Sequence, residues 1–304
     1  MKRPSNKVII EKYLNHYRHS KQSVKTRKSA LNYFFKKEYF GYNGHTFDIE
    51  TDVLIDYFDY LKFLERKSLA TKKTKWVLLK SFLNFCMEYY RKYDFNVIIP
   101  KHSINWKGII HKESETNKDI VMTTEEIQNI LEYLNLNHFK YYLIFRLFTE
   151  TGMRKGELIN IDYDNIKLEK RYIKTKGKTG YKIYYIPESL VKYLEIFLEE
   201  RKLKNAKTKA LFLSTHLKRY NERVFNAYLK KVLKDLNIEK NITCHTFRRT
   251  LNTLRKVMGC PNEDRKILLN HKVQDVNVES YVKMNYKQYI ELYDKWYPYY
   301  EVVL

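Results

Sequence analysis

Helical spacing of apolar residues along nearly the whole chain is the feature that most constrains its fold. The spacing changes once, at residues 171–187, where β-branched and aromatic residues flank the turn-forming run 176–180 and predict a β-hairpin. We therefore predict a mainly α fold with a small β-sheet. The predicted helices lie within residues 7–40, which hold two of them, and at about 51–66, 68–93, 122–134, 138–152, 188–204 and 221–236.

The predicted elements divide between two domains, for which 304 residues are sufficient. Residues 1–105 are predicted to form a helical domain and residues 120–304 a mixed α+β domain. Residues 106–119 are polar without a clear period, so they form the predicted linker. The C-terminal tail, residues 282–304, is too apolar for a free end and is expected to pack against protein.

Capping residues indicate where three of the helices begin or end. Thr51, and either Thr123 or Thr124, are expected N-caps, because their hydroxyls can accept from backbone N–H groups of the first turn. Gly152 follows a helix that is apolar nearly all round, so we expect it to end a buried helix.

The chain carries a large excess of positive charge, +23, from 58 Lys and Arg against 35 Asp and Glu, spread over both halves. This excess favours nucleic acid as a partner before a membrane surface, because no amphipathic anchor or lipidation signal accompanies it. The sequence has no run of 18 apolar residues, and its start has no apolar signal region. We therefore expect neither membrane spanning nor export.

The three cysteines, Cys86, Cys244 and Cys260, are odd in number and lack metal-ligand spacing. They predict buried thiols in a reducing cytoplasm and no metal site. Cys244 stands beside His245, but nothing around this pair provides the context of a thiol-protease nucleophile.

A set of polar residues in the C-terminal half suits a phosphate. His245 and Arg248 are three residues apart, on one face of a predicted helix, where a guanidinium fork can grip two oxygens while an imidazole moves a proton. Such a pair is a weak signal alone, since most are solvated or capping residues. Three further segments accompany it: Arg154 directly after Thr-Gly-Met, with Glu157 one turn later, then Asn270–His271, then Tyr281.

The order TGMRKGEL, HTFRR, LLNHK and Tyr281 resembles the tyrosine recombinase family, the phage-integrase and Xer-type site-specific recombinases. The resemblance is close in the C-terminal half and looser before it. It implies a helical core-binding domain and a mixed α+β catalytic domain that clamp double-stranded DNA. The implied activity is cutting and rejoining of DNA through a 3′-phosphotyrosine, without metal, ATP or cofactor, by a cytoplasmic protein. The implied assembly is a tetramer on two duplexes and a monomer or dimer off DNA.

The family's chemistry needs a tyrosine nucleophile and groups that remove its proton, because an ordinary phenol has a pKa of about 10. Glu157 fits the family's acidic position and is expected to brace an arginine or the backbone rather than to touch DNA. For the lysine that the family carries in a β-hairpin, Lys176 is the first choice, with Lys174 and Lys178 as alternatives. The resemblance implies Tyr281 as nucleophile, Arg154 and Arg248 as clamps on phosphate oxygens, His245 as orienting group or proton acceptor, His271 as hydrogen-bond donor, and Lys176 as proton donor to the leaving 5′ oxygen.

Three features depart from the family's pattern. The usual Leu-Gly-His turn is Leu-Asn-His here, which Asn270 tolerates because Asn can adopt a positive φ. Arg249 stands where many relatives have a second His. The spacing from His271 to Tyr281 is one residue longer than the commonest spacing in the family. Tyr286 and Tyr289 are neighbouring tyrosines, over which Tyr281 is favoured as the nucleophile.

The helix predicted at 68–93 begins with a basic run, although cations at a helix N-terminus oppose the helix dipole. DNA phosphate would justify that charge, and the segment resembles a helix of the family's core-binding domain. The predicted DNA contacts are Thr71, Lys72, Lys73 and Lys75 from this run, with Lys25 and Lys28 upstream.

Other functions use related residues and stay open at this point. A type IB topoisomerase shares the chemistry but relaxes DNA as a monomer, and a non-catalytic DNA-binding regulator could keep the scaffold. Within the recombinases, a mobile-element integrase and a chromosome-dimer resolvase use the same groups. The tail packs either on its own domain or, as in the family, on a neighbouring protomer.

Overall fold

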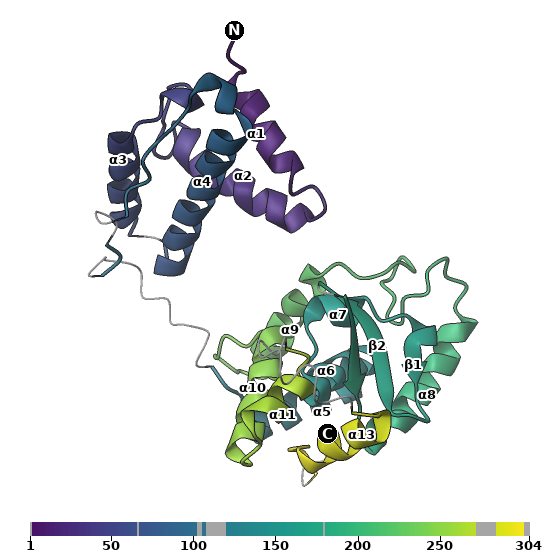
Figure 1. Cartoon of the computed structure of the whole chain (residues 1–304). Helices are drawn as coiled ribbons and strands as arrows, with labels where there is room; N and C mark the ends of the chain where they lie inside the picture. The colour runs from purple at the N-terminus through teal and green to yellow at the C-terminus, as the bar shows by residue number, and fades with distance from the viewer. Residues whose placement is uncertain are drawn as a thin grey trace. The chain divides into compact units, whose positions relative to one another are not determined.

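The chain, in a computed structural model, divides into two compact units, residues 1–116 and 117–304 (Figure 1). The predicted linker lies almost wholly outside the residues that the structure describes. The described residues are 2–65, 67–101, 105–107, 120–178, 180–271 and 284–300.

Helices build the first unit around a core rich in aromatic residues, with α4 packed against α2, α1 and α3. The helical spacing of residues 7–40 thus produces two helices, as predicted. The third helix ends earlier than predicted, at Lys62, and Thr51 is its first residue, whereas the N-cap is Glu50. The Thr51 hydroxyl instead donates to the carbonyl of Ile98 at 3.0 Å. The helices are α1 (Asn6–Asn15), α2 (Lys21–Phe35), α3 (Thr51–Lys62) and α4 (Leu69–Tyr89), with 3₁₀ turns η1 (Thr46–Asp48) and η2 (Arg91–Tyr93).

The second unit combines helices with one small sheet, which confirms the predicted fold class. Thr123 caps the first of its helices in a reciprocal capping box with Glu126. The elements are α5 (Thr124–Asn137), α6 (Phe139–Thr151), α7 (Lys155–Ile159), η3 (Tyr163–Asn165), β1 (Ile166–Lys167), β2 (Tyr172–Gly177), β3 (Gly180–Tyr185), α8 (Glu188–Leu203), α9 (Arg223–Asp235), α10 (Cys244–Val257), α11 (Asn262–Leu268) and α13 (Tyr286–Lys295).

The sheet is antiparallel with strand order β1-β2-β3. Lys176 pairs with Tyr181 and Gly177 with Gly180, so the hairpin turn lies where the sequence predicts it. Strand β1 is an addition to that hairpin, because a strand of two residues leaves no period in a sequence.

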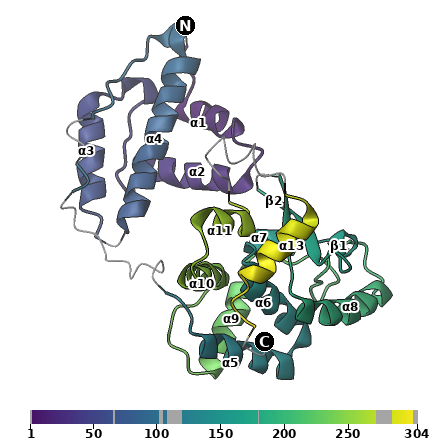
Figure 2. The ribbon, with the colours of Figure 1, turned by 60° about the horizontal axis from the view of Figure 1, so that its bottom comes forward.

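Helix α6 is the buried centre of the second unit. Its residues from Tyr142 to Thr151 are all buried, and α5, α7, α8 and α10 pack around it. Figure 2 shows α6 between α10 and α8. The helix ends at Gly152, which has the left-handed φ of 63°, as predicted for a glycine C-cap. The chain can therefore turn sharply from the core towards Arg154.

The tail residues that the structure describes pack on their own unit. The Tyr293 hydroxyl donates to the carbonyl of Glu150 at 3.1 Å, and the Tyr297 hydroxyl donates to Glu150 Oε1 at 3.1 Å. Arg171 holds Asp294 through two bonds of 2.9 and 2.6 Å. In this single chain, α13 therefore docks in cis over the end of α6.

All three cysteines are buried free thiols, as predicted. Within the described ranges, no helix has both the length and the apolar composition that crossing a membrane requires.

Gly152 is the position where a side chain should damage the second unit most. A Cβ there would lie 2.8 Å from Leu269 Cδ2 and 3.1 Å from Leu251 Cδ2, in a backbone conformation that alanine disfavours. We expect Gly152→Ala to lower the free energy of unfolding by roughly 1–2 kcal/mol for backbone strain and about 1–3 kcal/mol more for overpacking. Denaturant unfolding measures the loss.

Gly259→Ala is the matched control. Gly259 has a φ of 82°, but a Cβ there would meet nothing within 4 Å. This variant should show the backbone cost alone, and equal losses for the two variants would contradict the predicted clash.

Candidate active site

A single buried arginine joins the two distant segments that hold the predicted site. Arg248 lies on α10 and is 4% exposed. Its Nη1 donates to the carbonyl of Gly152 at 2.6 Å, and its Nη2 donates to the carbonyl of Leu269 at 2.6 Å. Gly152 precedes Arg154 by two residues and Leu269 precedes His271 by two. The bonds of Arg248 therefore bring the segment of Arg154 and the segment of His271 to one place.

Arg154 begins the short helix α7 and is held by Glu157. Glu157 Oε2 accepts from the Arg154 backbone N–H at 2.7 Å, and Glu157 Oε1 accepts from Arg154 Nη1 at 3.1 Å. The Arg154 side chain is 46% exposed, whereas that of Glu157 is 5% exposed. The buried carboxylate thus fixes the base of the arginine and leaves the rest of the guanidinium open to a ligand.

Two residues of the hairpin, not expected from the sequence, hold Glu157 in turn. The hydroxyl of Tyr184 on β3 donates to Glu157 Oε2 at 2.6 Å, and the hydroxyl of Thr175 on β2 donates to the Glu157 carbonyl at 2.5 Å. Burial alone would raise the pKa of Glu157, but hydrogen bonds from Tyr184 and from the Arg154 backbone lower it below its ordinary value. Glu157 is therefore an anion at neutral pH.

The two predicted histidines come from two different elements, His245 from α10 and His271 from the turn after α11. His245 lies in the first turn of α10, one turn before Arg248. His271 follows Asn270, which has the positive φ of 52° that the sequence predicts for the Leu-Asn-His turn. The Asn270 side-chain amide donates to the carbonyl of Ile183 on β3 at 2.8 Å, so the turn is tied to the hairpin.

Both imidazoles are kept neutral by their surroundings. Burial lowers the pKa of His271 to about 4, with further lowering by the charges of Arg248, Arg154 and His245. Burial also lowers the pKa of His245, followed by the charges of Arg248, Arg249 and Arg154. Since Arg154 and Arg248 act on both rings, the four predicted side chains share one electrostatic site.

Comparison with known proteins assigns the family. The model of the phage integrase family matches residues 121–288, more than half of the chain. The chain belongs to the phage integrase family. Tyrosine recombinase XerC of Caldanaerobacter subterraneus subsp. tengcongensis is 30% identical over 256 residues, which cover 78% of this chain and 69% of the relative. Tyrosine recombinase XerD of Staphylococcus aureus is 27% identical over 187 residues, 59% of this chain and 62% of the relative, which is less than two thirds of that protein.

Solved structures of integrases and recombinases share the fold. The Tn1549 transposon integrase in complex with circular intermediate DNA has a TM-score of 0.65 at 16% identity, covering 93% of this chain and 98% of that chain. XerH site-specific recombinase bound to difH substrate has a TM-score of 0.64 at 17% identity, covering 90% and 79%. The small sheet and surrounding helices of this chain are thus those of the tyrosine recombinase catalytic fold.

The three lysines predicted as candidates for the hairpin lysine lie on β2 and in the turn after it. Lys174 and Lys176 alternate there with buried Thr175, and Lys178 lies in the turn. The Lys174 ammonium lies 4.7 Å from the ring centre of Tyr181, whereas the Lys176 carbonyl accepts from the Asn160 side chain at 3.0 Å. The strand end that carries Lys176 is therefore pinned beside α7.

Tyr281, the predicted nucleophile, lies outside the described residues. The two neighbouring phenols are described: Tyr286 begins α13 and is exposed, and Tyr289 stacks on Tyr185 with ring centres 5.6 Å apart. Arg249 donates from Nη2 to the Thr246 hydroxyl at 3.2 Å.

Two of the predicted DNA contacts in the first unit are buried and need correction. Lys72 is 0% exposed, and its ammonium donates to the Lys62 carbonyl at 2.8 Å. Lys75 is 6% exposed and lies 3.1 Å from the ring centre of Tyr33, and burial lowers its pKa to about 8. Neither ammonium is presented to a phosphate. The predicted contacts that remain at the surface are Lys25, Lys28, Lys73 and the half-buried Thr71.

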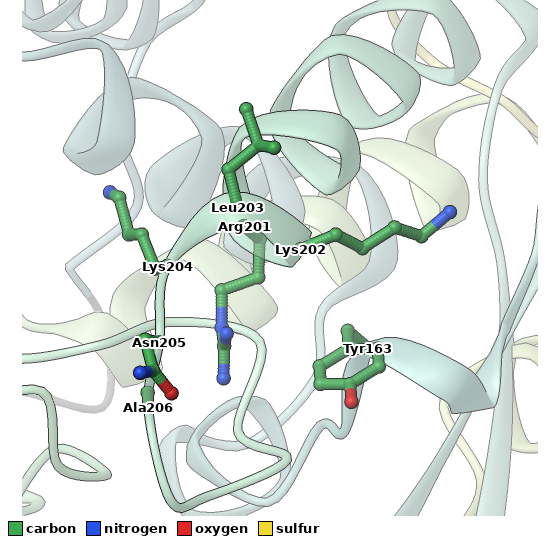
Figure 3. Close-up of a pocket in the computed structure, with 7 residues that line it drawn as sticks. All are labelled: Tyr163, Arg201, Lys202, Leu203, Lys204, Asn205 and Ala206. Carbon is green, nitrogen blue, oxygen red and sulfur yellow. The ribbon is translucent and has the colours of Figure 1, made fainter.

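A hollow of about 400 Å³ in the second unit is lined by other residues (Figure 3). Arg201 reaches from α8 between Asn205 and Tyr163, and its guanidinium donates to the carbonyls of Ala210 and Thr208 at 2.8 and 2.6 Å. These bonds hold the loop after α8, so we assign the hollow a structural origin. In the described part of the chain, no three His, Cys, Asp or Glu side chains converge as a metal ion would require.

The shared electrostatic site makes a titration prediction. Beyond the larger effects of burial and Arg248, the charge of Arg154 keeps the His271 ring neutral. We therefore expect Arg154→Met to raise the pKa of His271 above about 4, as measured by NMR titration of the ring protons.

Arg249→Met is its matched control. Arg249 lowers the pKa of His245, whereas the cations that act on His271 are Arg248 and Arg154. The control should raise the pKa of His245 and should not raise that of His271, which His245 itself lowers. A His271 pKa that Arg154→Met leaves unchanged would place the two residues in separate sites.

Proposed function

We propose that this chain is a site-specific DNA recombinase that cuts and rejoins duplex DNA through a 3′-phosphotyrosine at Tyr281. The observation that carries the proposal is the pair of bonds from Arg248 to Gly152 and Leu269, which gathers two arginines and two neutral imidazoles. Membership of the phage integrase family and relatives named tyrosine recombinases support it.

The proposed arginines neutralise the charge that develops on the attacked phosphate. Arg248 uses one hydrogen of each Nη for a carbonyl, so each Nη keeps a second hydrogen for a phosphate oxygen. Arg154 is half exposed and supplies its remaining donors from the other side. Cations fixed before the ligand arrives stabilise a transition state without reorganisation.

The proposed proton transfers use the neutral side chains. His245 accepts the phenol proton of Tyr281 as its oxygen attacks phosphorus, because a neutral ring has a free lone pair. His271 donates a hydrogen bond to the phosphate. The bond from phosphorus to the 5′ oxygen breaks, and Lys176 gives that oxygen its proton. The phosphodiester energy is kept in the tyrosine ester, so rejoining is the reverse reaction.

The proposed protein is cytoplasmic, acts on double-stranded DNA, and needs neither metal nor ATP. Its first unit is proposed as the core-binding domain and its second as the catalytic domain. The active assembly is proposed as a tetramer on two duplexes, with a monomer or dimer off DNA. The Tn1549 transposon integrase, which has the same fold, was solved in complex with circular intermediate DNA, and this supports the DNA partner.

Covalent capture tests the proposed reaction. The protein is incubated in EDTA, without nucleotide, with a pool of nicked duplexes of randomised sequence, and trapped strands are sequenced and their peptide mapped. We expect a 3′-linked adduct at Tyr281 with the wild-type chain and none with Tyr281→Phe.

Tyr286→Phe and Tyr289→Phe serve as controls that should keep the adduct. Mapping of the adduct to either of those tyrosines would overturn the assignment of Tyr281. With the captured sequence in two plasmids, recombinant products support a recombinase, whereas relaxation by a monomer alone supports the topoisomerase alternative.

Salt dependence tests the proposed contacts of the first unit. Each Lys that meets a phosphate contributes about 0.9 to the slope of log affinity against log salt for duplex DNA. We expect Lys25→Ala, Lys28→Ala and Lys73→Ala each to reduce the magnitude of that slope by about 0.9, the contribution of one phosphate contact.

Lys72→Met is the comparison for these variants, because Lys72 is buried. Provided it remains folded, it should leave the slope unchanged. A slope whose magnitude falls in Lys72→Met but is unchanged in the surface variants would contradict the conclusion that the Lys72 ammonium is not presented to DNA.

A further inference from the structure

We infer that Tyr184 is a positioning residue for the reaction, since its phenol holds the Glu157 carboxylate that fixes Arg154. The inference rests on the proposed function. It concerns a side chain on β3 that differs from every residue assigned a role in the chemistry above.

The phenol of Tyr184 is buried beside the carboxylate of Glu157. Tyr184 is 1% exposed, and its hydroxyl donates to Glu157 Oε2 at 2.6 Å. The charge of Arg248 lowers the pKa of this phenol, against the larger effects of burial and Glu157. A hydroxyl has one hydrogen, and Tyr184 donates it to the carboxylate.

The protonation state of Tyr184 fixes the direction of this link. Burial raises the pKa of its phenol well above the ordinary value, and the charge of Glu157 raises it further. The hydrogen therefore stays on the phenol and is directed at Glu157. These properties exclude Tyr184 as a nucleophile, since its oxygen is buried and protonated.

The oxygens of Glu157 are shared between two neighbours. Oε2 accepts from Tyr184 and from the Arg154 backbone, and Oε1 accepts from Arg154 Nη1. Removal of the phenol oxygen would leave Arg154 bound but would take away the largest hydrogen-bond contribution to the low pKa of Glu157. The bonds of Arg248 to its two carbonyls would stay.

The next residue of the strand provides a matched control. Tyr185 is also buried, but it lies on the opposite face of β3, where its ring stacks on Tyr289. Tyr184→Phe and Tyr185→Phe therefore each remove one phenol oxygen from the same strand, and only the first variant changes the site.

The test measures cleavage of the captured nicked duplex under single-turnover conditions, as a function of pH, well below the melting temperature of each variant. We expect Tyr184→Phe to slow adduct formation at saturating protein by about tenfold to hundredfold, the usual effect of a hydrogen bond to a charged group. Affinity for the duplex should change by less than about threefold, since DNA is held elsewhere as well.

The acid limb of the rate profile separates positioning from simple packing. Without the donor, the pKa of Glu157 rises, so the carboxylate is protonated at a higher pH and the rate should begin to fall at a higher pH. Tyr185→Phe should keep both the wild-type rate and the wild-type acid limb.

Each outcome decides the inference. A Tyr184→Phe protein with the wild-type rate and acid limb overturns it while leaving the proposed function intact. A wild-type chain that forms no adduct overturns the proposed function and this inference with it. If Tyr184→Phe does not fold, Glu157→Gln, which keeps the tyrosine in the core, must show the slow rate, and a wild-type rate for that variant overturns the inference.

Discussion

The two bonds from the buried guanidinium of Arg248 to backbone carbonyls are the interaction on which the rest of the site depends. Gly152 is the C-cap of α6 and Leu269 is the C-cap of α11, so both acceptors are carbonyls at helix ends, where the helix supplies no partner. A cation is favoured there by the negative end of each helix dipole. Beyond each capped end the chain turns outward and within two residues presents Arg154 or His271. One interaction thus satisfies two helix ends, holds a cation in the core and sets the spacing of the residues on either side.

The charge of this site is left for a ligand to neutralise. Among the described residues the carboxylate within the group is Glu157, and it is occupied by Arg154 and Tyr184. Arg248 is held by the carbonyls of Gly152 and Leu269, and no carboxylate is hydrogen-bonded to it among the described residues. The same cations keep His271 and His245 neutral, which leaves imidazole lone pairs available for a proton. A phosphate entering this group would relieve the repulsion between the arginines.

Features with a local physical cause could be predicted from the sequence, and features set by packing could not. Gly152 and Asn270 were predictable because a positive φ restricts the residue type, and the hairpin because its period differs from that of a helix. The burial of Lys72 follows from its helix face, since it stands four and seven residues before Trp76 and Leu79 on the buried side of α4. The prediction of Lys72 as a DNA contact followed its charge instead of its helical spacing, and was therefore wrong. Tyr184 is one of 28 tyrosines, and only its bond from β3 to Glu157 on α7 distinguishes it.

The central claim is that Arg154 and Arg248 act on one phosphate because the carbonyl framework holds them together. A crystal structure of the covalent adduct on a nicked duplex tests this most directly. The account predicts that both guanidinium groups donate to oxygens of the phosphate linked to Tyr281, while Arg248 keeps its bonds to Gly152 and Leu269. A structure in which the two arginines contact different phosphates, or in which Arg248 leaves both carbonyls to reach DNA, would contradict it.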